Sequence, residues 1–121
     1  PHEFPHAQSE FGPLFQRALS TLVELDPPRA EQFARGLGHL SGVVLERGIP
    51  GEVAELEERF RSVRMEHRNA LLRGVGEHLA IASEAPHIPD AARRLEAPEG
   101  AHVLEESFER NVRRVWGEEA E

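Results

Sequence analysis

Two histidines, His67 and His78, are the residues whose type and spacing could most readily do chemistry in this chain. Apolar residues around them recur with helical periodicity, and this pattern predicts one long helix that carries both imidazoles and Gly74 on its buried face. A buried imidazole requires a hydrogen-bond acceptor, a carboxylate, a metal ion or a ligand. The pattern therefore leaves three roles open for each ring: a structural hydrogen bond, ligand binding, or acid–base catalysis with a carboxylate such as Glu66 or Glu77.

Metal binding finds little support in the same residues. The two rings are about 16 Å apart along a helix that rises about 1.5 Å per residue, so they cannot share one ion. The Glu-x-x-His spacing of di-metal helical bundles does occur, but at positions interrupted by proline or at a helix start: Glu3–His6, Glu84–His87 and Glu99–His102. We predict no metal ligand and no catalytic residue, and the sequence names no cofactor.

Glycines form the second unusual pattern. Gly38 and Gly42 follow Ala34 at four-residue spacing in a helical segment, although each helical glycine costs about 1 kcal/mol relative to alanine. One explanation is a close crossing of two helices, which only small residues permit. The other is space for a ligand between helices, lined by His67 and His78 together with Gly38 and Gly74.

Helical periodicity is the only regular pattern along the chain, and it predicts an all-α fold, a bundle of four to five helices in a single domain. An N-terminal arm (1–12) precedes the helical bundle domain (13–117), and an acidic tail (118–121) follows it. Within the bundle we expect helices over about 13–25, 27–48, 51–73 and 101–116, with a short one over 89–95. Gly74 and Gly76 decide whether the third helix continues to about residue 83.

Composition restricts the possible partners. The formal net charge of −8 and the pI near 5.4 disfavour binding to nucleic acid or to an anionic membrane. No apolar run is long enough for a membrane span and no secretory leader is evident, so we expect a cytoplasmic protein. All 14 basic residues are arginine, which is typical of a GC-rich bacterial genome, and cysteine is absent.

The function predicted first is that of an interaction or regulatory module that acts through protein–protein contacts as a homodimer. Its interface would combine aromatic side chains with the glycine-lined helix face: Phe4, Phe11, Gly38, Gly42 and Trp116. The alternative is a sensor domain for a small molecule or cofactor, with the two histidines in an interhelical pocket. A catalytic or metal-binding bundle is the third possibility.

Overall fold

The computed structural model describes residues 11–96 and 102–117, and every regular element in these ranges is a helix. The elements are α1 (Phe11–Leu22), α2 (Pro27–Arg47), α3 (Pro50–Phe60), α4 (Met65–Ile81), α5 (Asp90–Glu96), α6 (Val103–Val112) and a π-helical turn η2 (Arg113–Gly117). The prediction of an all-α single domain is confirmed, with six α-helices in the described ranges rather than four or five. None of these helices is both long enough and apolar enough to cross a membrane.

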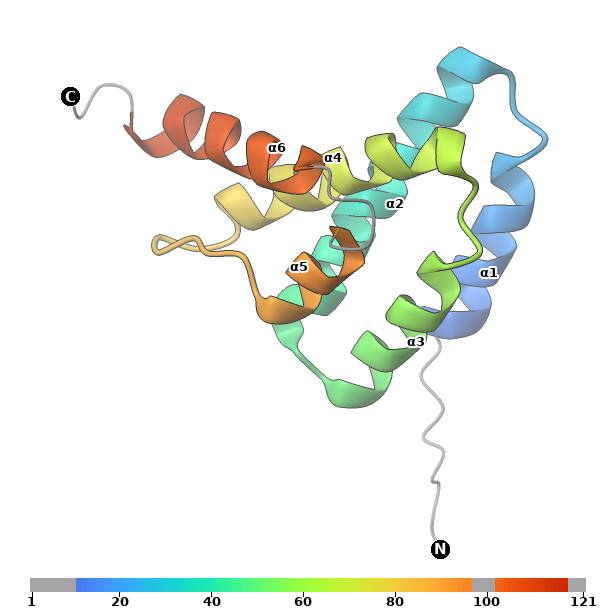
Figure 1. Cartoon of the computed structure of the whole chain (residues 1–121), viewed down its shortest axis with the longest axis horizontal. Coiled ribbons are helices and arrows are strands. Elements are labelled where there is room, and N and C mark those ends of the chain that lie inside the picture. The colour runs from blue at the N-terminus through green and yellow to red at the C-terminus, as the bar shows by residue number, and fades with distance from the viewer. Residues whose placement is uncertain (1–10, 97–101, 118–121) are drawn as a thin grey trace, which may run out of the picture.

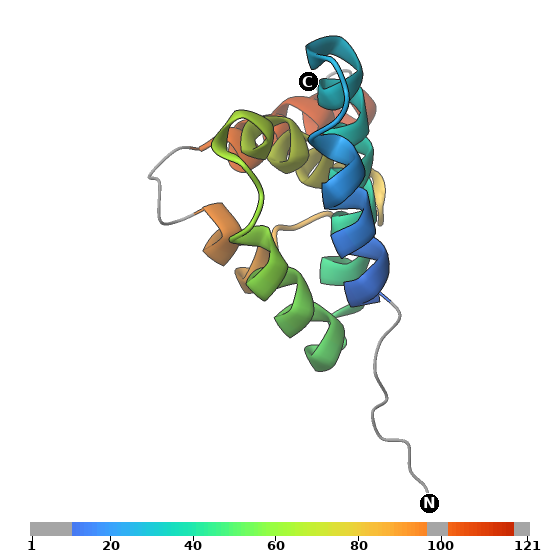
Figure 2. The same cartoon turned by 90° about the vertical axis from the view of Figure 1, so that its right-hand side faces the viewer.

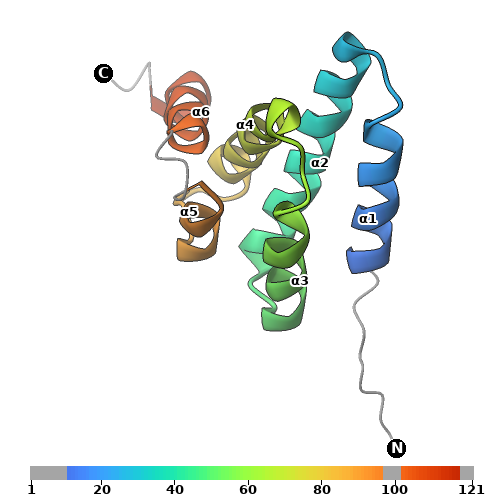
Figure 3. The same ribbon diagram turned by 45° about the vertical axis from the view of Figure 1, so that its right-hand side comes forward.

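Helices α2 and α4 form the centre of the fold, and the other helices pack around them (Figure 1). Gly38 lies against Gly74, and further along both helices Gly42 lies against His78. Residue numbers rise together along the two helices, so they run in the same general direction. Figure 3 shows α1 on one side of this pair and α6 on the other.

Glycine is required where α2 and α4 cross, because backbone meets backbone there. A Cβ atom on Gly38 would overlap the carbonyl oxygen of Leu71 and lie 2.8 Å from the Cα atom of Gly74. A Cβ atom on Gly42 would lie 2.9 Å from the Cβ atom of His78. The close-crossing explanation of the glycine pattern is therefore correct. The predicted ligand space at Gly38 and Gly74 is wrong, since the neighbouring helix fills it.

The predicted third helix is in fact two helices, α3 and α4. The chain leaves the helix after Phe60 through two tight turns, in which the amide of Ser62 donates to the carbonyl of Arg59 and that of Val63 to the carbonyl of Phe60. Arg68 then reaches back from α4, and its Nε atom donates to the Val63 carbonyl at 3.0 Å. The break is thus stabilised by a side chain, whereas Gly74 and Gly76 lie inside an unbroken α4.

Helix α6 runs along α4 in close contact. A Cβ atom on Gly76 would lie 2.7 Å from the carbonyl oxygen of Leu104 in α6. The hydroxyl of Ser107 donates to the Arg73 carbonyl at 2.9 Å, and the indole Nε1 of Trp116 donates to the Ala80 carbonyl at 2.7 Å. Gly76 therefore serves a second close helix contact and does not interrupt the helix.

The remaining helices complete the core. Helix α1 packs on α3, and α5 lies beside α3 below α4 (Figure 2). Phe11 is only 7% exposed, and its ring stacks on Phe15 with centroids 5.1 Å apart. The most deeply buried large side chains come from α1, α3, α4 and α6 as well as α2: Phe15, Leu22, Leu56, Leu71, Val75, Leu104 and Ser41. One core is therefore shared by the whole described chain.

Candidate functional site

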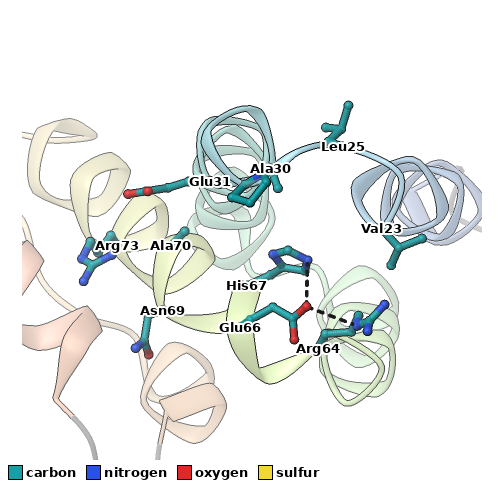
Figure 4. Close-up of a pocket in the computed structure, with 11 residues that line it drawn as sticks. Val23, Leu25, Ala30, Glu31, Arg64, Glu66, His67, Asn69, Ala70 and Arg73 are labelled. Atoms are coloured by element: carbon teal, nitrogen blue, oxygen red, sulfur yellow. Dashed lines mark ion pairs between the residues drawn. The ribbon is translucent and has the colours of Figure 1, made fainter.

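A cavity of about 680 Å³ lies where the α1–α2 loop meets the first turns of α2 and α4 (Figure 4). This volume falls within the range of about 300–1,000 Å³ that is typical of small-molecule sites. We call it the α1–α2–α4 pocket. Its lining residues are Val23, Leu25, Pro27, Ala30, Glu31, Arg64, Glu66, His67, Asn69, Ala70 and Arg73.

One side of the pocket wall is apolar and the opposite side is polar. The α1–α2 loop supplies apolar side chains, Val23 and Leu25, and the small residues Ala30 and Ala70 leave the floor open. The N-cap and the first three turns of α4 supply almost all the polar groups, because residues 64–73 contribute two arginines, a glutamate, a histidine and an asparagine to the lining. An apolar wall opposite several convergent polar groups is the usual composition of a ligand-binding site.

The His67 side chain is 13% exposed, whereas the neighbouring side chains of Glu66 and Arg64 are 62% and 57% exposed. Its Nε2 atom lies 3.9 Å from the nearest carboxylate oxygen of Glu66, and the Nε atom of Arg64 lies 3.6 Å from the same oxygen (Figure 4). Both distances exceed that of a hydrogen bond. The imidazole is thus held in the cavity by packing, with the Glu66 carboxylate near but not hydrogen-bonded to it, so its hydrogen-bonding capacity is available to a ligand.

His78 is in a different place from His67. Its Nε2–H donates to Glu46 on α2 at 3.0 Å, the side chain is 19% exposed, and the residue is not part of the α1–α2–α4 pocket. The prediction that both histidines line one pocket is therefore wrong. Both rings lie on the same side of the unbroken α4, but on either side of its crossing with α2: His67 lies beside the first turns of α2 and His78 beside Gly42 and Glu46.

A polar cluster that the sequence did not reveal lies beside His78. The Glu77 carboxylate accepts hydrogen bonds from the Arg35 guanidinium, whose Nε atom lies 2.9 Å away. It also accepts one from Nε2 of His39 at 2.8 Å. Burial by itself would raise the pKa of Glu77, but the hydrogen bonds from Arg35 and His39 and their charge outweigh it, so the pKa lies below its usual range. The hydrogen bond to Glu77 in turn raises the pKa of Arg35.

This cluster joins residues more than 35 positions apart in sequence, and its two imidazoles, His39 and His78, lie edge to face with centroids 6.3 Å apart. Each ring already donates to its own carboxylate, Glu77 or Glu46. The only sequence signal was the four-residue spacing of Arg35 and His39, which places both on one face of α2. The pairing with Glu77 depends on the helix crossing.

The residues predicted at a protein interface have separate outcomes. Phe11 is a core residue, not an exposed one, because α1 begins at this position and turns the ring inward. Gly38 and Gly42 are buried by α4 of the same chain and are not free for a partner. Trp116 is 41% exposed on η2. Phe4 lies outside the described residues, as does most of the predicted arm and the whole acidic tail.

Within residues 11–96 and 102–117, the histidine and carboxylate side chains form no group of three that could hold a metal ion. Comparison with known proteins adds no assignment: no family model, no curated protein and no solved structure matches this chain.

Proposed function

We propose that this chain is a small-molecule-binding helical domain whose ligand occupies the α1–α2–α4 pocket. The observation that carries the proposal is the cavity of about 680 Å³ into which the mostly buried His67 projects with no hydrogen-bond partner among the described residues. This corresponds to the sensor-domain alternative drawn from the sequence, with His67 in the site and His78 outside it.

Packing supports this proposal for a physical reason. Structural histidines are normally hydrogen-bonded by the protein itself, as His78 is by Glu46. His67 is held only by a contact of 3.9 Å to Glu66. A ligand with a hydrogen-bonding group and an apolar body would satisfy the ring and cover Val23 and Leu25 together.

The test uses indole, which has an apolar ring system and one N–H donor, as a probe. We expect saturable shifts in ¹H–¹⁵N correlation spectra, confined to residues 23–31 and 64–73, with a dissociation constant on the order of 1 mM, as is usual for a ligand of this size. Asn69 is an exposed residue of the pocket lining, so the indole ring of an Asn69→Trp variant can fill the cavity. This variant should abolish the shifts.

Two controls accompany this test. Asn69→Ala removes the amide but leaves the cavity open, so indole should still bind. Gln32→Trp adds the same indole ring at an exposed position of α2 outside the pocket, and it should also leave binding intact. Shifts spread over the whole surface, or binding unaffected by Asn69→Trp, would show that the cavity is not a ligand site.

We propose self-association as a second function, on the basis of the end of the molecule formed by α4 and η2. Three large apolar residues there are more than a third exposed: Ile81, Val115 and Trp116. Tryptophan is enriched among the residues that dominate binding energy at interfaces. Sedimentation equilibrium should show a dimer at micromolar concentration that Ile81→Ser weakens. A monomer at 100 μM, about the upper end of concentrations that matter for a specific dimer, would remove this proposal.

A further inference from the structure

Two opposite charges in the α1–α2–α4 pocket, Glu31 and Arg73, have no salt-bridge partner within residues 11–96 and 102–117. They lie on facing helices, α2 and α4, at the same end of the cavity (Figure 4). Neither side chain makes a hydrogen bond or an ion pair within 4.0 Å in the part of the chain that the structure describes, although the charge of Glu31 does act on nearby Arg35, which is already bonded to Glu77. Both groups are therefore available to a molecule that enters between them.

The balance of charge in the pocket indicates which class of molecule that is. Its lining includes two carboxylates, Glu31 and Glu66, and two guanidiniums, Arg64 and Arg73. A ligand with a single charge would be attracted by one pair of these groups and repelled by the other, so the lining gives it little net electrostatic stabilisation. Arg64 already lies 3.6 Å from Glu66, so a ligand that carries one positive and one negative charge complements the remaining two groups, Glu31 and Arg73.

The order of the lining residues along the pocket indicates how such a ligand would be oriented. Glu31 and Arg73 lie together at one end, Ala30 and Ala70 form the middle, and Leu25, Val23 and His67 lie at the other end (Figure 4). An ammonium and a carboxylate on the same carbon atom would fit between Glu31 and Arg73. An attached apolar side chain would then extend over the two alanines toward Leu25, and any polar group at its tip would reach His67.

We propose that the pocket binds an α-amino acid with a large apolar or aromatic side chain. The ammonium group donates to the Glu31 carboxylate, the carboxylate accepts from the Arg73 guanidinium, and the side chain packs against Ala30, Ala70 and Leu25. This inference rests on the proposed function, since it requires the α1–α2–α4 pocket to be a ligand site. The cavity volume favours the largest side chains over small ones such as alanine.

The test compares four molecules that share one phenyl ring. L-phenylalanine has both charges, phenethylamine lacks the carboxylate, 3-phenylpropanoate lacks the ammonium group, and 2-phenylethanol has neither charge. Titrations followed by ¹H–¹⁵N spectra at low ionic strength should show that L-phenylalanine binds about tenfold more tightly than either singly charged analogue, because each charge-assisted hydrogen bond is lost in one of them.

Two variants test which residue binds each charged group of the ligand. Glu31→Gln should weaken L-phenylalanine to the level of 3-phenylpropanoate while leaving 3-phenylpropanoate unchanged or slightly tighter. Arg73→Gln should weaken L-phenylalanine to the level of phenethylamine. Glu58→Gln on α3 and Arg113→Gln on η2 remove the same charges from exposed positions outside the pocket and should change nothing.

The outcomes separate this inference from the proposed function. If 2-phenylethanol binds in the pocket as well as L-phenylalanine does, the amino-acid inference is wrong and the ligand site remains. A preference for phenethylamine or 3-phenylpropanoate over L-phenylalanine overturns the inference in the same way. If neither indole nor any of the four molecules shifts residues 23–31 and 64–73, both the inference and the proposed function are wrong.

Discussion

Replacement of Gly38 by alanine tests the packing on which the whole fold depends. The added Cβ atom would overlap the Leu71 carbonyl oxygen and lie 2.8 Å from the Cα atom of Gly74. Both neighbours are backbone, so neither can rotate away as a flexible side chain would. The helices α2 and α4 must move apart, and this exposes or loosens the core on both sides of the crossing.

The magnitude follows from two opposing effects. Alanine in place of glycine stabilises a helix interior by about 1 kcal/mol. Overpacking of a well-packed contact destabilises by about 1–3 kcal/mol, and the upper end applies where only backbone can yield. We expect Gly38→Ala to lower the free energy of unfolding by about 2 kcal/mol in total.

Gly36 provides a matched control on the same helix. No atom of a neighbouring element lies within 4 Å of a Cβ built at this position, so Gly36→Ala should gain the helical preference with no overlap. The two alanine variants should therefore differ by about 3 kcal/mol in the free energy of unfolding, with opposite signs relative to the native chain.

The assay is urea denaturation followed by circular dichroism at 222 nm, analysed with a common slope. The double variant Gly38→Ala with Gly74→Ala should be less destabilised than the sum of the single variants, because the first substitution already separates the helices. A Gly38→Ala variant as stable as Gly36→Ala would refute the close backbone contact between α2 and α4.

Two further predictions concern individual side chains. Because the pKa of Glu77 is lowered on folding, its contribution to stability is present above the unfolded-state pKa of about 4.3 and is lost as pH falls through the lower folded value. The difference in urea midpoint between the native chain and Glu77→Gln should accordingly shrink from pH 6 to pH 3, and a constant difference would contradict the charged pairing with Arg35 and His39. Trp116→Phe removes the indole donor to the Ala80 carbonyl and should reduce stability by about 1 kcal/mol in the same assay. An unchanged midpoint would mean that this hydrogen bond does not hold η2 against α4.

Local sequence determined the helices and most of their buried faces. The spacing of apolar residues is set by 3.6 residues per turn, so it identified α1, α2 and α6 without knowledge of the fold. Proline and glycine marked the ends of α2, where Pro27 begins the helix and Gly48 ends it with a φ of 69°. These features depend only on neighbours along the chain.

The sequence also indicated that the helical glycines have a structural or functional role, but it left two explanations open. A missing side chain is compatible with a close helix crossing and with an empty space, and only the position of the neighbouring helix distinguishes them. At Gly38 and Gly74 that neighbour is backbone, and the apparent cavity is absent from the described structure there. The actual pocket lies instead beside Ala30 and Ala70, and alanine is too common in helices for these two residues to indicate a cavity from the sequence.

Tertiary structure alone decided the break between α3 and α4 and the partners of the charged groups. No proline or glycine stands at residues 61–64, and the break is stabilised by Arg68, which donates to the Val63 carbonyl from the next helix. The fold likewise pairs Glu77 with Arg35 and His39 and leaves Glu31 and Arg73 unpaired at one end of a pocket. A long charged side chain can reach many partners, and its choice depends on which helices cross and where.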